Sequence, residues 1–242
     1  MSAPEPIHLR PTAELAERVL LPGDPGRALA LAQTLIAKPL MFNHHRGLWG
    51  YTGPANHDGQ PLTIQSTGMG GPSAAIVLCE LAALGAQRAI RVGSCGALDP
   101  GLELGELVIA REAVCADGAS RALAGSSRVS ADGALTESLI AACPRARAGT
   151  VLSVDLFYDA AGRHRALRGE DAECEGGEAE IAIEMEAATV FALGASLGVR
   201  VACVLAVTDT FTAGEARGRL DDHGLLEAAE RMGAAAVAAL AA

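Results

Sequence analysis

Short apolar segments alternate with Ala- and Leu-rich segments along this chain, and this alternation limits the folds that it can adopt. Buried strands are indicated over 18–21, 89–92, 106–110, 150–154 and 201–207, with a hairpin over 49–66. Helices are indicated over 25–36, 74–84, 181–197 and from about 221 to the C-terminus. Alternating strands and helices place the helices on both faces of a sheet. We therefore expect an α/β fold over residues 1–242, a single-domain three-layer αβα arrangement with a central mixed, largely parallel sheet.

The net charge and the cysteines argue against several classes of protein. A formal charge of −10 disfavours binding to the nucleic-acid backbone, although a small anion can still bind in a local basic pocket. None of the six cysteines forms a Cys-x-x-Cys pair, which favours reduced thiols over disulfides or zinc ligands. The N-terminus lacks an apolar signal core, and charged residues and glycine interrupt the Ala-rich C-terminal run. We therefore expect a cytoplasmic protein without a membrane span or a metal site.

Arg91 stands in a segment that is otherwise typical of a buried strand. An unpaired buried charge is strongly destabilising, so we expect an anionic group to meet its guanidinium. Gly93 and Ser94 follow, and they predict a turn whose N–H groups and hydroxyl suit phosphate oxygens. The alternative is a structural carboxylate paired with Arg91, and this segment by itself favours neither partner.

A second arginine follows a glycine turn near the N-terminus. Gly23 and Arg27 bound the sequence Gly-Asp-Pro-Gly-Arg, which opens the first predicted helix. The start of a helix attracts anions through its free N–H groups and its dipole. Gly-Asp-Pro-Gly is also an ordinary turn, but together with Arg91 it indicates two arginines on one phosphate. We expect the unusual residues that follow the strands to converge at one edge of the sheet.

Two carboxylates flank a methionine near the start of the helix predicted over 181–197. Glu184 and Glu186, on either side of Met185, are suited to bind vicinal hydroxyls of a sugar, since a carboxylate accepts several hydrogen bonds. The alternative is that acidic residues stabilise the first turn of a helix. Without other context, this segment favours the alternative.

A carboxyl group and two arginines follow the strand predicted over 201–207. A buried Asp209 is suited to general acid catalysis, whereas the alternative is an ordinary turn cap. Arg217 and Arg219 come shortly afterwards, and either one is near enough in sequence to hold Asp209. Solvated surface charge is the simpler interpretation of each arginine.

Two aromatic residues, Phe157 and Tyr158, follow the strand predicted over 150–154. Aromatic residues make up only 3% of the chain, so a pair at a strand end calls for an explanation. They are suited to stack on a flat heterocycle. The alternative is packing beneath the loop that follows.

Seven short motifs, in this order, resemble those of the bacterial hexameric-type purine nucleoside phosphorylases, which share a superfamily with uridine phosphorylase. The resemblance runs from about His8 to the last predicted helix. Each motif is modest by itself, and the shared order of all seven carries the resemblance. The motifs lie at 21–27, 46–53, 68–70, 91–96, 154–158, 184–187 and 207–209.

The resemblance implies a role for residues in each motif. The implied phosphate-binding residues are Gly23, Arg27, Arg91 and Ser94, with Arg46 donated by a neighbouring subunit. The implied nucleoside-binding residues are His8 of the neighbour at the ribose 5′-hydroxyl, Met69, Met185 and Glu186 at the ribose, Phe157 stacked on the base, and Glu184 close to the base. The implied catalytic residues are Asp209, which protonates purine N7, and Arg217, which supports it.

The implied reaction is reversible phosphorolysis of a purine ribo- or deoxyribonucleoside to the free base and the sugar 1-phosphate. The resemblance implies inorganic phosphate as the co-substrate, and neither a metal nor an organic cofactor. Because His8 and Arg46 would act in a neighbouring site, it also implies a homo-oligomer, a hexamer built from dimers.

The resemblance leaves two alternatives open. The sequences at 70–73 and 186–189 resemble uridine phosphorylase, whereas the sequence at 91–96 and Asp209 favour the purine enzymes. A non-catalytic nucleoside-binding protein of the same fold is the second alternative.

Two segments depart from the family. The charged connection over 160–180 is longer and more acidic than expected, and the segment after Asp209 is shortened, so that Arg219 is a candidate to replace Arg217.

Overall fold

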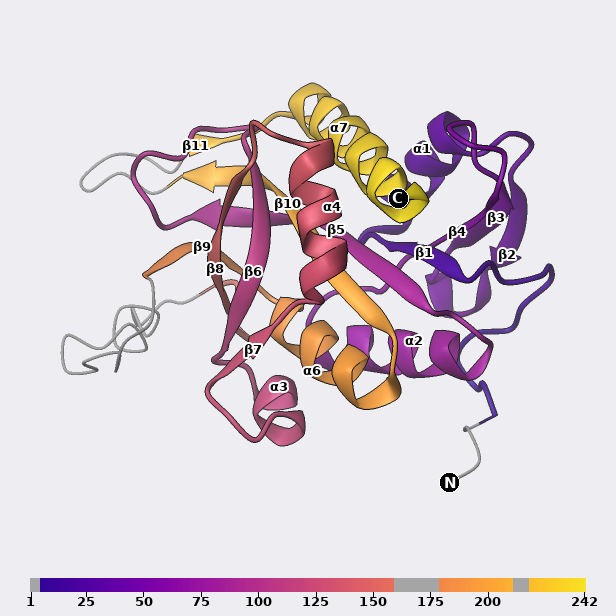
Figure 1. Cartoon of the computed structure of the whole chain (residues 1–242), viewed down its shortest axis with the longest axis horizontal. Helices are drawn as coiled ribbons and strands as arrows, with labels where there is room; N and C mark the ends of the chain where they lie inside the picture. Colours follow the sequence, from indigo (N-terminus) through magenta and orange to yellow (C-terminus); the bar gives the residue numbers. More distant parts are fainter. Residues whose placement is uncertain (1–4, 159–178, 211–217) are drawn as a thin grey trace.

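The computed structural model describes residues 5–158, 179–210 and 218–242 (Figure 1). Its helices are α1 (Pro25–Leu35), η1 (His45–Gly47, a 3-10 turn), α2 (Gly71–Ala83), α3 (Gly118–Leu123), α4 (Gly133–Ala142), α6 (Ala187–Leu197) and α7 (Asp222–Ala241). Its strands are β1 (Arg18–Leu21), β2 (Leu40–Asn43), β3 (Gly50–Pro54), β4 (Pro61–Gln65), β5 (Arg88–Ala97), β6 (Leu107–Cys115), β7 (Arg128–Ser130), β8 (Arg147–Ser153), β9 (Glu180–Glu184), β10 (Arg200–Thr210) and β11 (Gly218–Arg219).

The described strands form one mixed sheet. Its centre is parallel, because β4, β1, β5 and β10 lie side by side and run in the same direction. β3 and β2 continue the sheet beyond β4 in antiparallel order, and β11 pairs antiparallel with the end of β10. Helices α2, α3 and α6 cover one side and α1, α4 and α7 the other (Figure 1). The predicted α/β fold with a mixed central sheet is confirmed.

One half of this sheet closes on itself, which the sequence did not predict. β10 pairs with β6, β6 with β8, and β8 with β9. β9 then pairs with the last residues of β5, and β5 pairs with β10, so five strands form a closed ring. The closure brings the end of β9, which carries Glu184, to the strand that carries Arg91.

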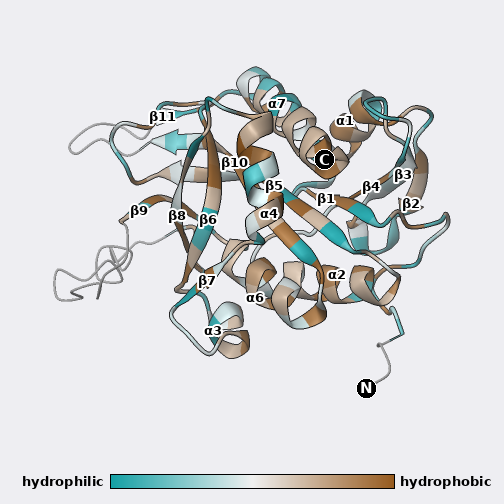
Figure 2. Cartoon of the chain, in the orientation of Figure 1, coloured by the Kyte–Doolittle hydropathy of each residue, from teal (hydrophilic) through white to brown (hydrophobic). Residues whose placement is uncertain are grey.

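Two apolar cores lie on opposite faces of β5 and β10. Val201 and Cys203 of β10 belong to the core that α2 and α6 cover, whereas Ala202 between them belongs to the core beneath α1, α4 and α7. This is the period of two expected of a strand buried on both faces. α2 and α6 are apolar over most of their length (Figure 2). On β5, Ala89 belongs to the α2 and α6 side, which places Arg91 on that side as well.

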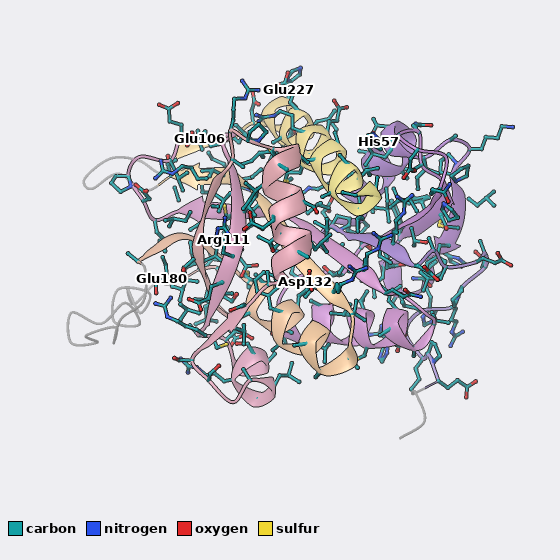
Figure 3. The ribbon with its side chains drawn as sticks, viewed as in Figure 1. His57, Glu106, Arg111, Asp132, Glu180 and Glu227 are labelled. Atoms are coloured by element: carbon teal, nitrogen blue, oxygen red, sulfur yellow. The ribbon has the colours of Figure 1, made fainter. Side chains whose placement is uncertain are left out.

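Aspartates begin four of the described helices. The residue before each of α1, α3, α4 and α7 accepts a hydrogen bond from the backbone N–H three residues later; these caps are Asp24, Asp117, Asp132 (labelled in Figure 3) and Asp221. α2 and α6 begin instead after Gly70 and Glu186, neither of which forms a side-chain cap. Both exceptions belong to motifs that the sequence analysis assigned to the site.

The helix predicted over 181–197 is wrong in its first part. Residues 180–184 form strand β9, and α6 begins only at Ala187. Ile181 and Ile183 are β-branched and suit a strand. Glu184 therefore ends a strand and Glu186 precedes a helix, instead of both lying in one helical turn. Strand β6 is also longer than predicted, and the sequence analysis did not predict β2, β7, α3 and α4.

Two segments singled out in the sequence are not part of the described structure. Arg217 and nearly all of the connection over 160–180 lie outside the described residues.

Across the described part, no helix combines the length and the apolar character needed to cross a membrane. The same part holds no cluster of His, Cys, Asp and Glu side chains suited to a metal ion.

Candidate active site

Arg91 is buried, with 4% of its surface exposed, and two carboxylates meet its guanidinium. Nη2 lies 2.5 Å from Oε2 of Glu186 and 3.0 Å from Oε2 of Glu184, and Nε donates to the same Glu184 oxygen at 3.1 Å. Burial by itself would lower the pKa of Arg91, but the carboxylates of Glu186 and Glu184 raise it above its usual range. The anionic partners of Arg91 among the described residues are therefore the carboxylates of Glu184 and Glu186.

The turn predicted at Gly93 and Ser94 is wrong, because both residues lie inside β5. They pair in register with Leu205 and Ala206 of β10. Gly93 instead leaves room for the guanidinium of Arg91, since an ideal Cβ at position 93 would lie 2.8 Å from Cζ of Arg91. Glycine at this position lets the arginine fold back over its own strand.

Glu184 forms the rigid half of this cluster. Its carboxylate accepts hydrogen bonds from the hydroxyl of Ser153 and from the backbone N–H groups of Glu186 (2.8 Å) and Ala187 (2.8 Å), besides that from Arg91. Burial raises the pKa of Glu184, whereas Arg91 lowers it and Glu186 raises it. The carboxylate thus caps the start of α6 and holds Arg91, so its contacts point to those groups and not to the solvent.

Glu186 links Arg91 to the glycine-rich loop before α2. Its second oxygen, Oε1, accepts a hydrogen bond of 2.5 Å from the backbone N–H of Gly70. Gly70 has a φ of 84° and Gly68 a φ of 75°, values that favour glycine. Met69 between them is 86% exposed, whereas Met185 is only partly exposed. Met69 and Met185 therefore each lie next in sequence to a residue of the contact between Gly70 and Glu186.

Arg27 and Gly23 lie on the other side of the same loop. Gly68 donates a backbone hydrogen bond of 3.0 Å to the carbonyl of Gly23. Burial lowers the pKa of Arg27, Asp24 raises it, Arg91 lowers it and Glu186 raises it. The charges of Arg91 and Glu186 therefore act on the guanidinium of Arg27. Leu21, two residues before Gly23, pairs in register with Arg91, which places the start of this turn beside that arginine.

Asp209 lies within β10, near its end, and only 4% of its surface is exposed. It pairs in register with Gly96 of β5 on one side and with Arg219 of β11 on the other. Nη1 of Arg219 lies 4.0 Å from its Oδ1, and the Thr208 hydroxyl donates to its Oδ2 at 2.9 Å. Of the two arginines proposed to hold Asp209, Arg219 is therefore the one described beside it.

The aromatic pair lies at the surface after β8. Phe157 is 45% exposed and Tyr158 86% exposed, and their ring centroids lie 4.9 Å apart in an edge-to-face arrangement. Val154, three residues before Phe157, donates its backbone N–H to the carbonyl of Glu184. The pair thus follows the strand that borders Glu184.

His8 and Arg46 lie away from the Arg91 cluster. His8 contacts Glu80 in the last part of α2, whereas Glu186 contacts Gly70 just before the first turn of that helix. Arg46 lies in η1, is exposed and has a φ of 60°, a conformation uncommon for residues other than glycine. The structure therefore does not bring these two residues together with Arg91 in one subunit.

Two residues of these networks, Ser153 and Glu80, were not predicted from the sequence. Ser153 bonds to Glu184 and also accepts the backbone N–H of Ala188. Glu80 is a buried acid in the apolar helix α2 and holds His8. A lone carboxylate among apolar neighbours was the available signal for Glu80, whereas a serine at the end of a strand gives none.

A surface hollow of about 480 Å³ lies elsewhere, between the end of β6 and α3. Its lining residues are Val114, Cys115, Ala116, Arg121, Ala124, Gly125, Ser126 and Ser127. None of them belongs to the predicted site, and apart from Arg121 they carry no charge. The hollow therefore offers fewer charged groups for binding an anion or a sugar than the cluster of Arg91, Glu184 and Glu186.

Known proteins resemble this chain over most of its length. The model of the phosphorylase superfamily matches residues 17–242. A uridine phosphorylase of Thermococcus kodakarensis is 39% identical over 80% of this chain and 73% of its own length. DeoD-type purine nucleoside phosphorylases of Geobacillus kaustophilus and Caldanaerobacter subterraneus are 32% and 34% identical over 84% of this chain, and over 85% and 87% of their own lengths. The chain therefore belongs to the phosphorylase superfamily.

Proposed function

We propose that this protein catalyses the reversible phosphorolysis of purine ribo- and deoxyribonucleosides to the free base and the sugar 1-phosphate. The observation that carries the proposal is the contact of Arg91 with Glu186, beside the turn at Gly23 that leads to Arg27: Leu21 before this turn pairs in register with Arg91. Two cations suit a phosphate, and the carboxylate beside them suits the hydroxyls of a ribose. Relatives that are named for nucleoside phosphorolysis support the same reaction.

In this proposal, Arg91 exchanges one of its partners when phosphate binds. Glu184 keeps its contacts with the start of α6 and continues to hold the guanidinium. Glu186 contacts one nitrogen of Arg91, whereas Glu184 contacts two, so Glu186 is the partner that phosphate displaces. Glu186 then accepts hydrogen bonds from the ribose 2′- and 3′-hydroxyls, with Met69 and Met185 against the sugar.

The chemistry forms one bond and breaks one. A phosphate oxygen bonds to C1′, and the electron pair of the bond between C1′ and the base leaves with the base. The bound phosphate and Glu186 stabilise the positive charge that develops on the sugar. Asp209 donates a proton to N7 of the departing purine, Arg219 or Arg217 supports Asp209, and Phe157 stacks on the base. No metal or organic cofactor takes part.

The purine specificity rests on Asp209, because a pyrimidine offers no N7 to protonate. A buried carboxyl at the end of β10 supports a general acid on the base side. Uridine is the alternative substrate, and the relative from Thermococcus kodakarensis, a uridine phosphorylase, favours it.

We also propose a homo-oligomer, a hexamer built from dimers, in which His8 and the exposed Arg46 complete the site of the neighbouring subunit.

The experiment that tests the proposal is base release from inosine, guanosine, adenosine and uridine, each with and without phosphate. Phosphate-dependent release from a purine nucleoside is the expected result. Phosphate-dependent release from uridine alone would contradict the purine assignment and keep the phosphate site. Release without phosphate would contradict the roles of Arg27 and Arg91. Binding without any release would support a non-catalytic nucleoside-binding protein.

A further inference from the structure

A single buried acid on α2 organises the N-terminal segment of the chain. Glu80 is 6% exposed, and its carboxylate accepts the backbone N–H groups of Ile7 at 3.1 Å, His8 at 3.0 Å and Leu9 at 2.6 Å. An acid in an apolar helix is costly unless its oxygens are satisfied. The three successive N–H groups satisfy the buried carboxylate, and these hydrogen bonds hold residues 7–9 against α2.

The same carboxylate contacts the imidazole of His8. Nδ1 of His8 lies 2.7 Å from Oε1 of Glu80. Burial by itself would raise the pKa of Glu80, but the hydrogen bonds from His8, Leu9 and Ile7 lower it from 4.5 to about 2. At neutral pH the carboxylate is thus ionised and accepts hydrogen bonds only. Nδ1 of His8 must therefore be the donor and carry the proton.

The position of this proton decides what the other ring nitrogen does. A neutral imidazole with its proton on Nδ1 has a lone pair on Nε2, which accepts a hydrogen bond. The His8 ring is 31% exposed, and His45 donates from its Nδ1 to the His8 carbonyl at 3.0 Å. His8 is thus held from two sides, through its ring and through its backbone.

We propose that Glu80 is a positioning residue that fixes the Nδ1–H tautomer of His8, so that Nε2 accepts a hydrogen bond from a substrate hydroxyl. The inference rests on the proposed function for the identity of that hydroxyl, the ribose 5′-hydroxyl in a neighbouring subunit. An acceptor at this point favours a 5′-hydroxyl over a 5′-phosphate, whose ionised oxygens also accept. Glu80 therefore contributes to the selection of nucleosides over nucleotides.

The first test reads the tautomer directly, in the full-length protein without substrate. Nitrogen-15 NMR of the histidine side chains distinguishes Nδ1–H from Nε2–H, and His8→Gln assigns the signal. The expected result is Nδ1–H in the wild type. Glu80→Gln supplies an amide that can donate to Nδ1, so the proton is expected to move to Nε2. A wild-type proton on Nε2, or an unchanged tautomer in Glu80→Gln, would overturn the inference.

The second test measures 5′-hydroxyl recognition as the ratio of kcat/KM for a nucleoside to that for its 5′-deoxy analogue. Glu80→Gln is expected to lower this ratio about fivefold to tenfold, the equivalent of one net hydrogen bond. Asp58→Asn is the matched control, since it also converts a hydrogen-bonded acid of lowered pKa into an amide, in the β3–β4 turn. That control is expected to leave the ratio unchanged.

The two tests separate this inference from the proposed function. If no nucleoside is cleaved, the proposed function fails while the spectra still decide the tautomer. If nucleosides are cleaved but Glu80→Gln and Asp58→Asn change the ratio equally, Glu80 has a structural role only and the inference fails by itself. A Glu80→Gln protein that does not fold leaves the wild-type spectrum as the deciding measurement.

Discussion

The guanidinium of Arg91 lies over Gly93, two residues further along the same strand. A Cβ at position 93 would lie 2.8 Å from both Cζ and Nη2 of Arg91. The glycine is therefore required by a close approach of side chain to backbone and not by a turn. This relationship joins the proposed phosphate-binding arginine to the backbone of β5, and it makes Gly93 a sensitive test of the site.

Gly93→Ala is expected to displace the guanidinium of Arg91 and to raise the KM for phosphate more than the KM for the nucleoside. Crowding in a packed interior should also lower the free energy of unfolding by about 1–3 kcal/mol. The measurements are phosphate and nucleoside titrations of the initial rate, together with urea unfolding. Gly125→Ala is the control, because no atom lies near a Cβ built there. Equal changes in both KM values would contradict a specific effect on Arg91.

Arg91→Lys is expected to abolish most of the phosphate-dependent activity. Lysine has no Nε–H to donate to Glu184 and cannot bridge both carboxylates in the same geometry. Leaving Glu184 and Glu186 poorly paired should destabilise the protein by about 3 kcal/mol. Arg111→Lys is the comparison, since its ion pair with Glu137 is exposed and should change stability by less than about 1 kcal/mol. Similar unfolding curves for the two variants would show that the buried cluster contributes little.

Asp209→Asn is expected to slow phosphorolysis of inosine by about 100-fold or more, because general acid catalysis is lost. The loss should be much smaller for 7-methylguanosine, whose base already carries a positive charge and leaves without protonation. Initial rates on both nucleosides check this difference. A uniform loss on both substrates would mean that Asp209 holds the fold or the base instead of donating a proton.

Glu80 is expected to make stability depend on pH in the acidic range. Its pKa is about 2 in the folded protein against an ordinary value of 4.5. Because the folded pKa is lowered, the stabilisation is complete above pH 4.5 and is lost as the pH falls from 4.5 towards 2. At pH 6 it amounts to about 3 kcal/mol. Urea unfolding of the wild type and Glu80→Gln, at one protein concentration and several pH values, checks the difference. A difference that stays constant down to pH 3 would count against this linkage.

Local sequence signals located much of the fold. Strand β1, the start of α1 at Pro25, the β3–β4 hairpin and the start of α7 follow from apolar patterns, proline and glycine positions and aspartate caps. They were predictable because each depends on residues close together in sequence. The ordered motifs likewise located the arginines and carboxylates, and the family match over residues 17–242 confirms the superfamily to which they pointed.

Other features depended on contacts between distant segments. Residues 181–184 were predicted as the first part of a helix that continues to 197, and only pairing with β8 and with the end of β5 makes them a strand. For the same reason the sequence did not reveal the closed ring of five strands. Strand pairing is a long-range interaction, and a local pattern does not specify the partner.

The sequence by itself determined which chemical groups the proposed site contains: two arginines, two carboxylates around a methionine, and an aspartate at the end of an apolar strand. Only the tertiary structure decided how they are paired. It made Glu184 the fixed support of Arg91, left Glu186 with one oxygen on Arg91 and the other on Gly70, and set Arg219 opposite Asp209. The physical reason is that a buried charge takes whichever partner the packing brings within hydrogen-bonding distance, and packing depends on the whole chain.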